Sequence, residues 1–173
     1  MEQAGATWEG AVVVATEHSF EDFFELEQER LLRLLWMVTG SLQEAEDIVQ
    51  DAFLKVWERW PQVSRLDSPV GYLHRAAMNL FRNRYRRAML AVRKAVGSTQ
   101  PVDAFGAVED RVSVSRALGS LTPRQRAALV LTELLGYPAD EAGRMLGVRA
   151  STVRSLASAG RNALRNAKEL VDE

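Results

Sequence analysis

The chain has 173 residues, enough for one domain or two small ones, and 47% of them are hydrophobic and 26% charged, as in proteins with a buried core. The absence of cysteine excludes disulfides, zinc–thiolate sites and cysteine nucleophiles, and it fits a cytoplasmic location. No apolar run approaches the ~20 residues that span a bilayer, and the N-terminus lacks a secretory signal pattern. We therefore expect a cytoplasmic protein without membrane insertion.

Charge is unevenly distributed along the chain. The overall net charge of −1 argues against a nucleic-acid binder, since such domains are usually basic. Residues 1–60, however, carry 13 acids and 4 bases, residues 61–102 carry 1 acid and 8 bases, and residues 103–173 carry 9 acids and 10 bases. The segments are therefore −9, +7 and +1, which indicates surfaces for different partners. A basic helix face that is merely solvated would also explain the excess.

Residues 1–18 are expected to form an N-terminal extension, and the chain becomes regular after it. Apolar residues recur at helical spacing from Phe20, and Gly40 is a typical stop. Ser41 and Glu44 have the spacing of a capping box at the start of the next helix.

The expected second helix has a wide apolar face that includes Trp57 and Trp60, with Pro61 just beyond its end. A polar loop over 62–68 precedes a third helix, which begins near Pro69 and ends near Lys94.

The periodicity fails over residues 96–109, which are rich in Gly, Ser, Thr and Pro and predict a flexible linker. After the linker, Thr122-Pro123-Arg124-Gln125 predicts a capped helix start. A short helix to Leu146, a turn at Gly147 and a long helix from about Ala150 to Leu170 have the pattern of a helix-turn-helix. We therefore expect an all-α chain of two small helical domains, 19–95 and 110–173, joined by this linker.

Three helices present candidate binding faces. On the second helix, Asp47 and Asp51 are neighbours of like charge, which a protein tolerates more readily where a basic partner binds, although solvation alone explains many such pairs. On the third helix, a basic stripe with interleaved aromatic residues is typical of proteins that bind single-stranded or opened DNA. Its members are Arg75, Asn79, Arg82, Asn83 and Arg86.

The last helix carries Arg and Ser side chains opposite its apolar face, as in helices that enter the major groove. These residues are Ser151, Arg154, Ser155, Ser158, Arg161 and Arg165. A solvated face of a helical bundle would give a similar pattern. No arrangement of nucleophile, His cluster or Gly-rich loop indicates catalysis, a metal or a cofactor, so we expect none of these.

The segment Ala45–Trp57 resembles the polymerase-binding helix of bacterial extracytoplasmic-function (ECF) sigma factors. The segment Tyr72–Leu80 with the following arginines resembles their helix for the −10 promoter element. Leu121–Arg126 and Gly147–Leu164 are similar to their −35-reading domain, although Leu156 stands where many members carry Arg or Gln. The resemblance covers roughly residues 20–168, with the motifs in the family's order.

The resemblance implies a non-enzymatic subunit that binds core RNA polymerase, contacts both promoter elements and helps to open the −10 DNA. Asp47, Gln50 and Asp51 would face the β′ clamp helices, and the linker would run toward the RNA exit path near the β subunit. The basic stripe and the 64–68 loop would contact the −10 strand, and the polar face of the last helix would contact the −35 duplex. An anti-sigma protein is a further partner of this class. The competing hypothesis is a helix-turn-helix transcriptional regulator with a DNA-binding end like that of response regulators.

Overall fold

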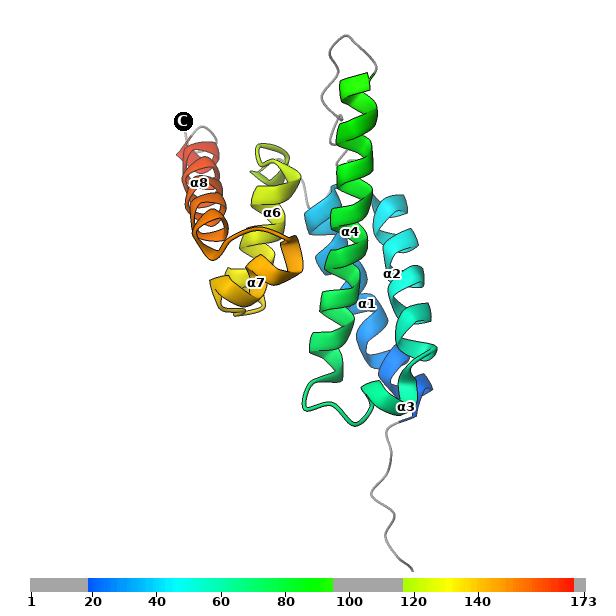
Figure 1. Cartoon of the computed structure of the whole chain (residues 1–173). Coiled ribbons are helices and arrows are strands. Elements are labelled where there is room, and N and C mark those ends of the chain that lie inside the picture. Colours follow the sequence, from blue (N-terminus) through cyan, green and yellow to red (C-terminus); the bar gives the residue numbers. More distant parts are fainter. Residues whose placement is uncertain (1–18, 95–116, 170–173) are drawn as a thin grey trace, which may run out of the picture.

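The computed structural model describes residues 19–94 and 117–169, and Figure 1 shows their helices. No strand occurs in these two ranges, so the predicted all-α fold is confirmed there. The expected N-terminal extension and the 96–109 linker lie outside the described residues. The elements are α1 (Phe20–Thr39), α2 (Leu42–Trp57), α3 (Trp60–Val63), α4 (Pro69–Lys94), α6 (Pro123–Leu129), the π-helical turn η2 (Val130–Leu134), α7 (Ala139–Leu146) and α8 (Ala150–Glu169).

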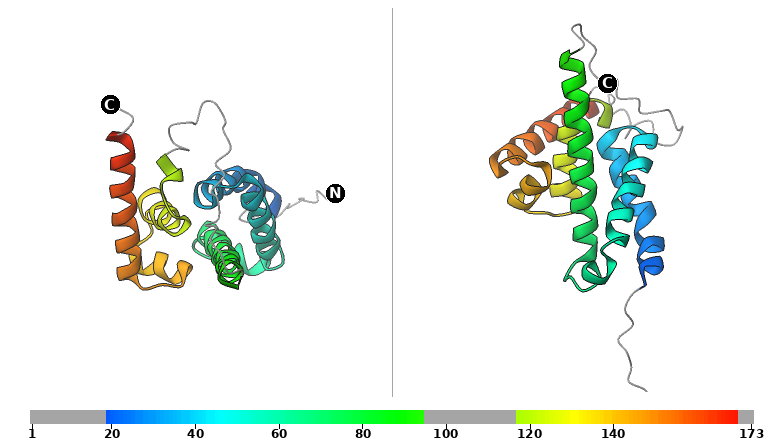
Figure 2. Two further views of the ribbon diagram at one scale, coloured as in Figure 1. Left: turned by 90° about the horizontal axis from the view of Figure 1, so that it is seen from above. Right: turned by 45° about the vertical axis from the view of Figure 1, so that its right-hand side comes forward.

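The helices form two units that lie side by side. Helices α1, α2 and α4 run alongside one another, with the short α3 at one end, and α6, α7 and α8 form a second unit next to α1 and α4 (Figure 2). Buried residues of both units belong to one continuous apolar cluster. The two units therefore share a core in this structure.

Helix boundaries follow the capping residues. Gly40 ends α1 with φ 77°, as predicted, and Ser41 Oγ accepts the Glu44 N–H at 3.3 Å. The predicted reciprocal bond from Ser41 N–H to the Glu44 carboxylate is wrong, because that N–H donates to Thr39 Oγ1 at 3.2 Å. At Thr122 both halves of the predicted capping box with Gln125 form, at 2.8 and 3.3 Å.

The end of α2 differs from the prediction. The helix stops at Trp57, and Trp60 begins the separate helix α3, in whose first turn Pro61 is accommodated. The Trp60 ring packs against Phe20 and Phe23, with centroids at 5.6 and 5.1 Å. Trp57, which was expected in the core, is 59% exposed, because the chain changes direction before the apolar face can continue.

The C-terminal unit has the predicted helix-turn-helix. Gly147 ends α7 with φ 66°, a conformation that glycine adopts without strain. The turn also packs tightly against α7, since a Cβ on Gly143 would lie 2.7 Å from the Val148 carbonyl oxygen. Val153 and Ala157 of α8 are buried against the unit, which leaves the opposite side of α8 exposed.

Candidate functional site

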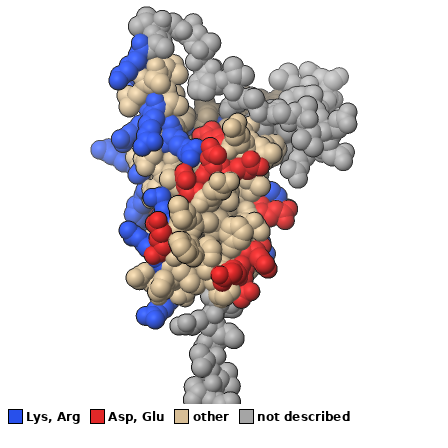
Figure 3. Space-filling view, turned by 90° about the vertical axis from the view of Figure 1, so that its right-hand side faces the viewer, with Lys and Arg blue, Asp and Glu red and all other residues tan. Residues whose placement is uncertain are grey.

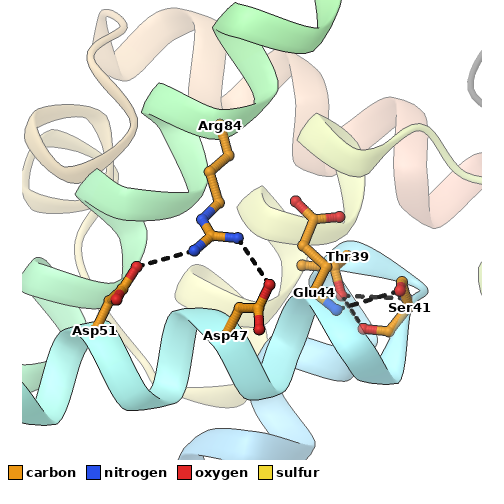
Figure 4. Close-up of polar contacts among 6 residues, drawn as sticks. All are labelled: Thr39, Ser41, Glu44, Asp47, Asp51 and Arg84. Atoms are coloured by element: carbon orange, nitrogen blue, oxygen red, sulfur yellow. Dashed lines mark hydrogen bonds and ion pairs between the residues drawn. The ribbon is translucent and has the colours of Figure 1, made fainter.

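The acidic face of α2 is joined to α4 by one arginine. Arg84 of α4 donates to Asp51 Oδ2 at 2.9 Å and to Asp47 Oδ2 at 3.3 Å, and Figure 4 shows the guanidinium between the two carboxylates. The hydrogen bond to Asp51 is the largest of the influences that raise the pKa of Arg84. Both aspartates remain about half exposed, so they can still meet an external partner.

The sequence-based interpretation did not predict that Arg84 pairs with the two aspartates. Asp47 and Asp51 were interpreted as tolerated by an external partner or by solvent, whereas Arg84 offsets part of their mutual repulsion within the chain. The sequence contains a signal for this contact. Arg84 follows Arg82 by two residues, so on a helix its side chain projects about 200° away from that of Arg82, from the side opposite the basic stripe.

Exposed apolar side chains lie next to the carboxylates on α2. Leu54 is 53% and Trp57 59% exposed, and with Gln50 they line a shallow hollow floored by Phe20, Phe24 and Phe53. Large apolar residues in a partly exposed hollow beside polar side chains are typical of protein-binding surfaces. Gln50 therefore faces this hollow, whereas Asp47 and Asp51 face Arg84.

The basic stripe of α4 divides between two hollows. Asn79 and Asn83, together with Arg75, line one that also contains Tyr72 and basic residues near the end of α2. Arg82 and Arg86 line a separate cavity of about 480 Å³ between α4 and the C-terminal unit. Aromatic and aliphatic side chains floor this second cavity: Phe81, Tyr85, Met89, Leu90, Leu146, Val148 and Leu156.

Leu156 has a structural role. It is half buried and lines the cavity beside α4, so it faces away from the polar side of α8. Leu156, which stands where many family members carry Arg or Gln, therefore lies on the side of α8 that faces the cavity and not on its polar face.

The surface carries both signs of charge close together. Viewed from the side of α2, carboxylates lie beside a column of Lys and Arg side chains (Figure 3). Helix α4 forms three ion pairs with other elements: the two from Arg84 to α2 described above, and one from Arg75 to Glu141 of α7 at 2.9 Å. Arg75 of the basic stripe therefore has an acidic partner that is distant in sequence, and Arg84, which lies outside the stripe, has two.

The predicted face of α8 is exposed along its length. Each of its six candidate residues is exposed: Ser151, Arg154, Ser155, Ser158, Arg161 and Arg165. Their contacts are mostly local, since Arg165 donates to Asn162 Oδ1 at 2.9 Å and Ser155 Oγ to the Ser151 carbonyl at 3.0 Å. Arg161 reaches Glu133 at 2.6 Å, which braces α8 against η2.

Within the described ranges, no group of three or more His, Cys, Asp or Glu side chains is arranged to hold a metal ion. The same ranges contain no helix with the length and apolar character needed to cross a bilayer.

Comparisons with known proteins place these surfaces in context. Residues 23–90 match the family model of sigma-70 region 2, and residues 111–164 match that of sigma-70 region 4. The chain is 33% identical over 156 residues to the ECF RNA polymerase sigma factor SigM of Mycobacterium tuberculosis, covering 89% of this chain and 79% of SigM. It is 32% identical over 157 residues to SigE of Mycolicibacterium smegmatis, covering 86% of this chain and 61% of SigE.

Solved structures show the same fold. The sigma factor RpoE of Bartonella quintana, in complex with the anti-sigma factor NepR, aligns with a TM-score of 0.65 at 22% identity, over 88% of this chain and 98% of that one. SigJ of Mycobacterium tuberculosis aligns with a TM-score of 0.56 at 28% identity, over 84% of this chain and 53% of SigJ.

Region 2 binds core RNA polymerase and the −10 element, and region 4 binds the −35 element. Such proteins are non-catalytic subunits, as the sequence predicted. The match to region 2 overturns the competing hypothesis of a helix-turn-helix regulator, which accounts for the C-terminal unit alone. The chain belongs to the ECF RNA polymerase sigma factors.

Proposed function

We propose specific roles for the exposed faces of the three long helices in promoter recognition. Region 2 corresponds to residues 19–95, region 4 to 110–173, and 96–109 link them. The observation that carries the assignment is the separation of the faces: carboxylates and exposed Trp57 on α2, basic and amide groups on α4, and Arg with Ser on α8.

Helix α2 binds the β′ clamp helices of core polymerase. Asp47 and Asp51 supply the charged contacts, and Gln50 with Leu54 and Trp57 supplies the adjacent hollow. Tryptophan is enriched among residues that dominate interface energies, because it buries a large rigid ring. We expect the aspartates to set the salt dependence of polymerase binding and Trp57 to contribute most of its free energy.

Helix α4 binds the −10 strand through Arg75, Asn79, Arg82, Asn83 and Arg86. The amides and the arginines lie along one side of the helix, where Tyr72 and Tyr85 are half exposed. Arginine contacts to phosphate release counterions, so −10 binding should weaken steeply as salt rises. Helix α8 binds the −35 duplex through Ser151, Arg154, Ser155, Ser158, Arg161 and Arg165, all of which are exposed.

A cytoplasmic location follows from the partner, since core polymerase works there. We also propose an anti-sigma partner for this chain. The support is the likeness to RpoE, which was solved in complex with the anti-sigma factor NepR.

Run-off transcription with purified core polymerase and genomic fragments tests the proposal and reports the promoter. We expect transcripts only with this chain added, and their absence over all fragments would contradict the assignment.

For α2, Asp47→Asn with Asp51→Asn should weaken binding to core polymerase. Glu46→Gln is the matched control, because Glu46 is an exposed carboxylate on the same helix outside the pair. If the double variant and the control bound core polymerase with equal affinity, the assignment of Asp47 and Asp51 to the interface would be wrong.

A further inference from the structure

The cavity between α4 and the C-terminal unit combines an apolar floor with several arginines. Its volume of about 480 Å³ lies within the range of ~300–1,000 Å³ that small-molecule sites occupy. The arginines that line it are Arg82, Arg86 and Arg93 from α4 and Arg124 from α6. Among the described residues, no Asp or Glu lines it. The cavity is therefore both apolar and cationic.

These four arginines have no carboxylate partners in the described part of the chain. None of them forms an ion pair within residues 19–94 and 117–169, whereas Arg75 on the same helix pairs with Glu141. The Arg82 Nε is buried without a hydrogen-bond partner among the described residues. Guanidinium groups bind carboxylate and phosphate oxygens in a bidentate geometry. An anion in the cavity would supply such oxygens and would reduce the repulsion between the arginines.

The apolar floor of the cavity remains partly accessible to water. Leu90 is 50% exposed, and Tyr85 and Met89 are half buried. The Tyr85 ring contacts both the buried ring of Phe81, with centroids 5.9 Å apart, and the Arg124 guanidinium, whose Cζ lies 5.8 Å from the Tyr85 centroid. A ligand with a hydrocarbon body would remove this surface from water, which is favourable.

Opened DNA alone does not account for the floor. Single strands bind cationic grooves through their phosphates and stack their bases on aromatic rings. Tyr85 could serve for stacking, but most of the floor is aliphatic, with Met89, Leu90, Val148 and Leu156. An aliphatic surface matches an acyl chain or another hydrocarbon body instead.

We propose that this cavity binds a small amphipathic anion, a molecule with a carboxylate or phosphate head and a hydrocarbon body. The head lies among the guanidinium groups, and the body covers the floor around Tyr85 and Leu90. Because Arg82 and Arg86 are also assigned to the −10 strand, the bound anion would compete with that strand. This competition rests on the proposed function, whereas the site itself does not.

Calorimetric titration of the full chain with alkanoates tests the site. Decanoate is the main probe, octanoate and dodecanoate vary the body, acetate has the head alone, and decyltrimethylammonium reverses the charge of the head. We expect one decanoate per chain and up to about fourfold tighter binding for each added CH₂ group, the gain for complete burial. Acetate and the cation should not bind. Decyl phosphate should displace decanoate, and the tighter of the two identifies the preferred head.

Two double variants show whether decanoate occupies the cavity. Arg93→Gln with Arg124→Gln removes two charges from the cavity and leaves every residue proposed for the −10 strand in place. Arg87→Gln with Arg144→Gln is the matched control, because it removes two charges from α4 and α7 outside the cavity. All four side chains are exposed, so both variants should fold. We expect the cavity pair to weaken decanoate binding about tenfold and the control pair to change it less than twofold.

A further pair of variants tests the floor. Leu90→Asn places a polar group in the cavity at a position that is 50% exposed, so it should reduce the gain in affinity for each CH₂ group. Leu134→Asn is its control, because Leu134 is 58% exposed and lies outside the cavity. An equal gain in both variants would contradict the placement of the hydrocarbon body.

The absence of decanoate binding at millimolar concentration would overturn the proposal, and so would an equal loss of affinity in the two double variants. If neither double variant nor the wild type bound decanoate while the cavity pair alone lost affinity for single-stranded DNA of random sequence, the cavity would serve DNA and the proposal would be wrong. The calorimetry requires neither polymerase nor promoter. Run-off transcription with the wild-type chain therefore distinguishes failure of the proposed function from failure of the site.

Discussion

Regions 2 and 4 both present an exposed basic face, but they hold it differently. In region 2, Arg84 and Arg75 reach carboxylates on other elements, so α4 is tied to α2 and α7. In region 4, the polar side chains of α8 make mostly local contacts, apart from Arg161 to Glu133. The difference indicates that arginines of region 2 help to position its helices, whereas the polar face of α8 makes few contacts with other described elements.

The two regions also contribute different side chains to their shared core. Region 2 is built around aromatic rings, with Phe53 contacting Phe20, Phe23 and Phe24 at centroid distances of 4.8 to 6.3 Å. The buried apolar residues described in region 4 are Leu, Val, Met and Ala without an aromatic ring, such as Leu131, Met145 and Ala157. Larger rings bury more apolar area. We therefore expect region 2 to be the more stable unit, and region 4 to depend on close backbone approach.

The largest effect is expected from Phe53→Ala, which removes the ring at the centre of the region 2 core. Phe53 is 3% exposed, so the substitution should lower the free energy of unfolding by about 3–5 kcal/mol. Chemical denaturation measures the loss. Trp57→Ala on the same helix is the control, because an exposed aromatic residue should cost under about 0.5 kcal/mol. A similar loss in both variants would contradict the boundary between core and surface on α2.

The corresponding substitution in region 4 is Gly143→Ala. The new methyl group would lie 2.7 Å from a backbone oxygen of the turn, so we expect a loss of about 1–3 kcal/mol in unfolding free energy. Gly160→Ala is the matched control: its Cβ would meet side-chain rather than backbone atoms, Leu129 Cδ1 at 2.8 Å and Cγ at 3.2 Å, and alanine favours helix. If Gly160→Ala proved the more damaging, region 4 would not depend on the α7–α8 turn.

A smaller effect should distinguish an arginine of region 2 from one of region 4. Arg84→Gln removes a half-buried side chain bound to two carboxylates and leaves Asp47 and Asp51 to repel each other, so it should cost about 1 kcal/mol of unfolding free energy. Arg161→Gln removes a single exposed pair and should cost about 0.5 kcal/mol or less. Thermal or urea unfolding at low and high salt measures both. Equal costs would contradict the greater structural role of the region 2 arginine.

The smallest effect concerns pH. Burial lowers the pKa of His74 below its ordinary value of 6.5, so the unfolded chain binds more protons than the folded one in this range. Titration of His74 therefore leaves the free energy of unfolding unchanged above pH 6.5. Below that pH the free energy of unfolding declines until the pH reaches the lowered pKa of His74 in the folded chain. Stability curves of the wild type and His74→Gln between pH 5 and 8 test this: the variant should lose the part of the slope just below pH 6.5. An unchanged slope would remove His74 as its source.

The sequence by itself determined the all-helical class, several helix ends and the family. Gly40, Gly147 and the Thr122 capping box mark helix ends through local backbone requirements, and the segment charges of −9, +7 and +1 predict separate surfaces for different partners. These features depend on neighbours along the chain, so the pattern alone predicts them.

Only the tertiary structure decided which charges meet. Arg84 pairs with residues 33 and 37 positions away, Arg75 with one 66 positions away, and Arg126 with carbonyls 87 and 88 positions away. It also decided that Trp60 enters the core and Trp57 does not, because a change of direction after α2 outweighs the apolar periodicity. Contacts of this range arise from how helices pack, and spacing along one helix carries no information about its neighbours.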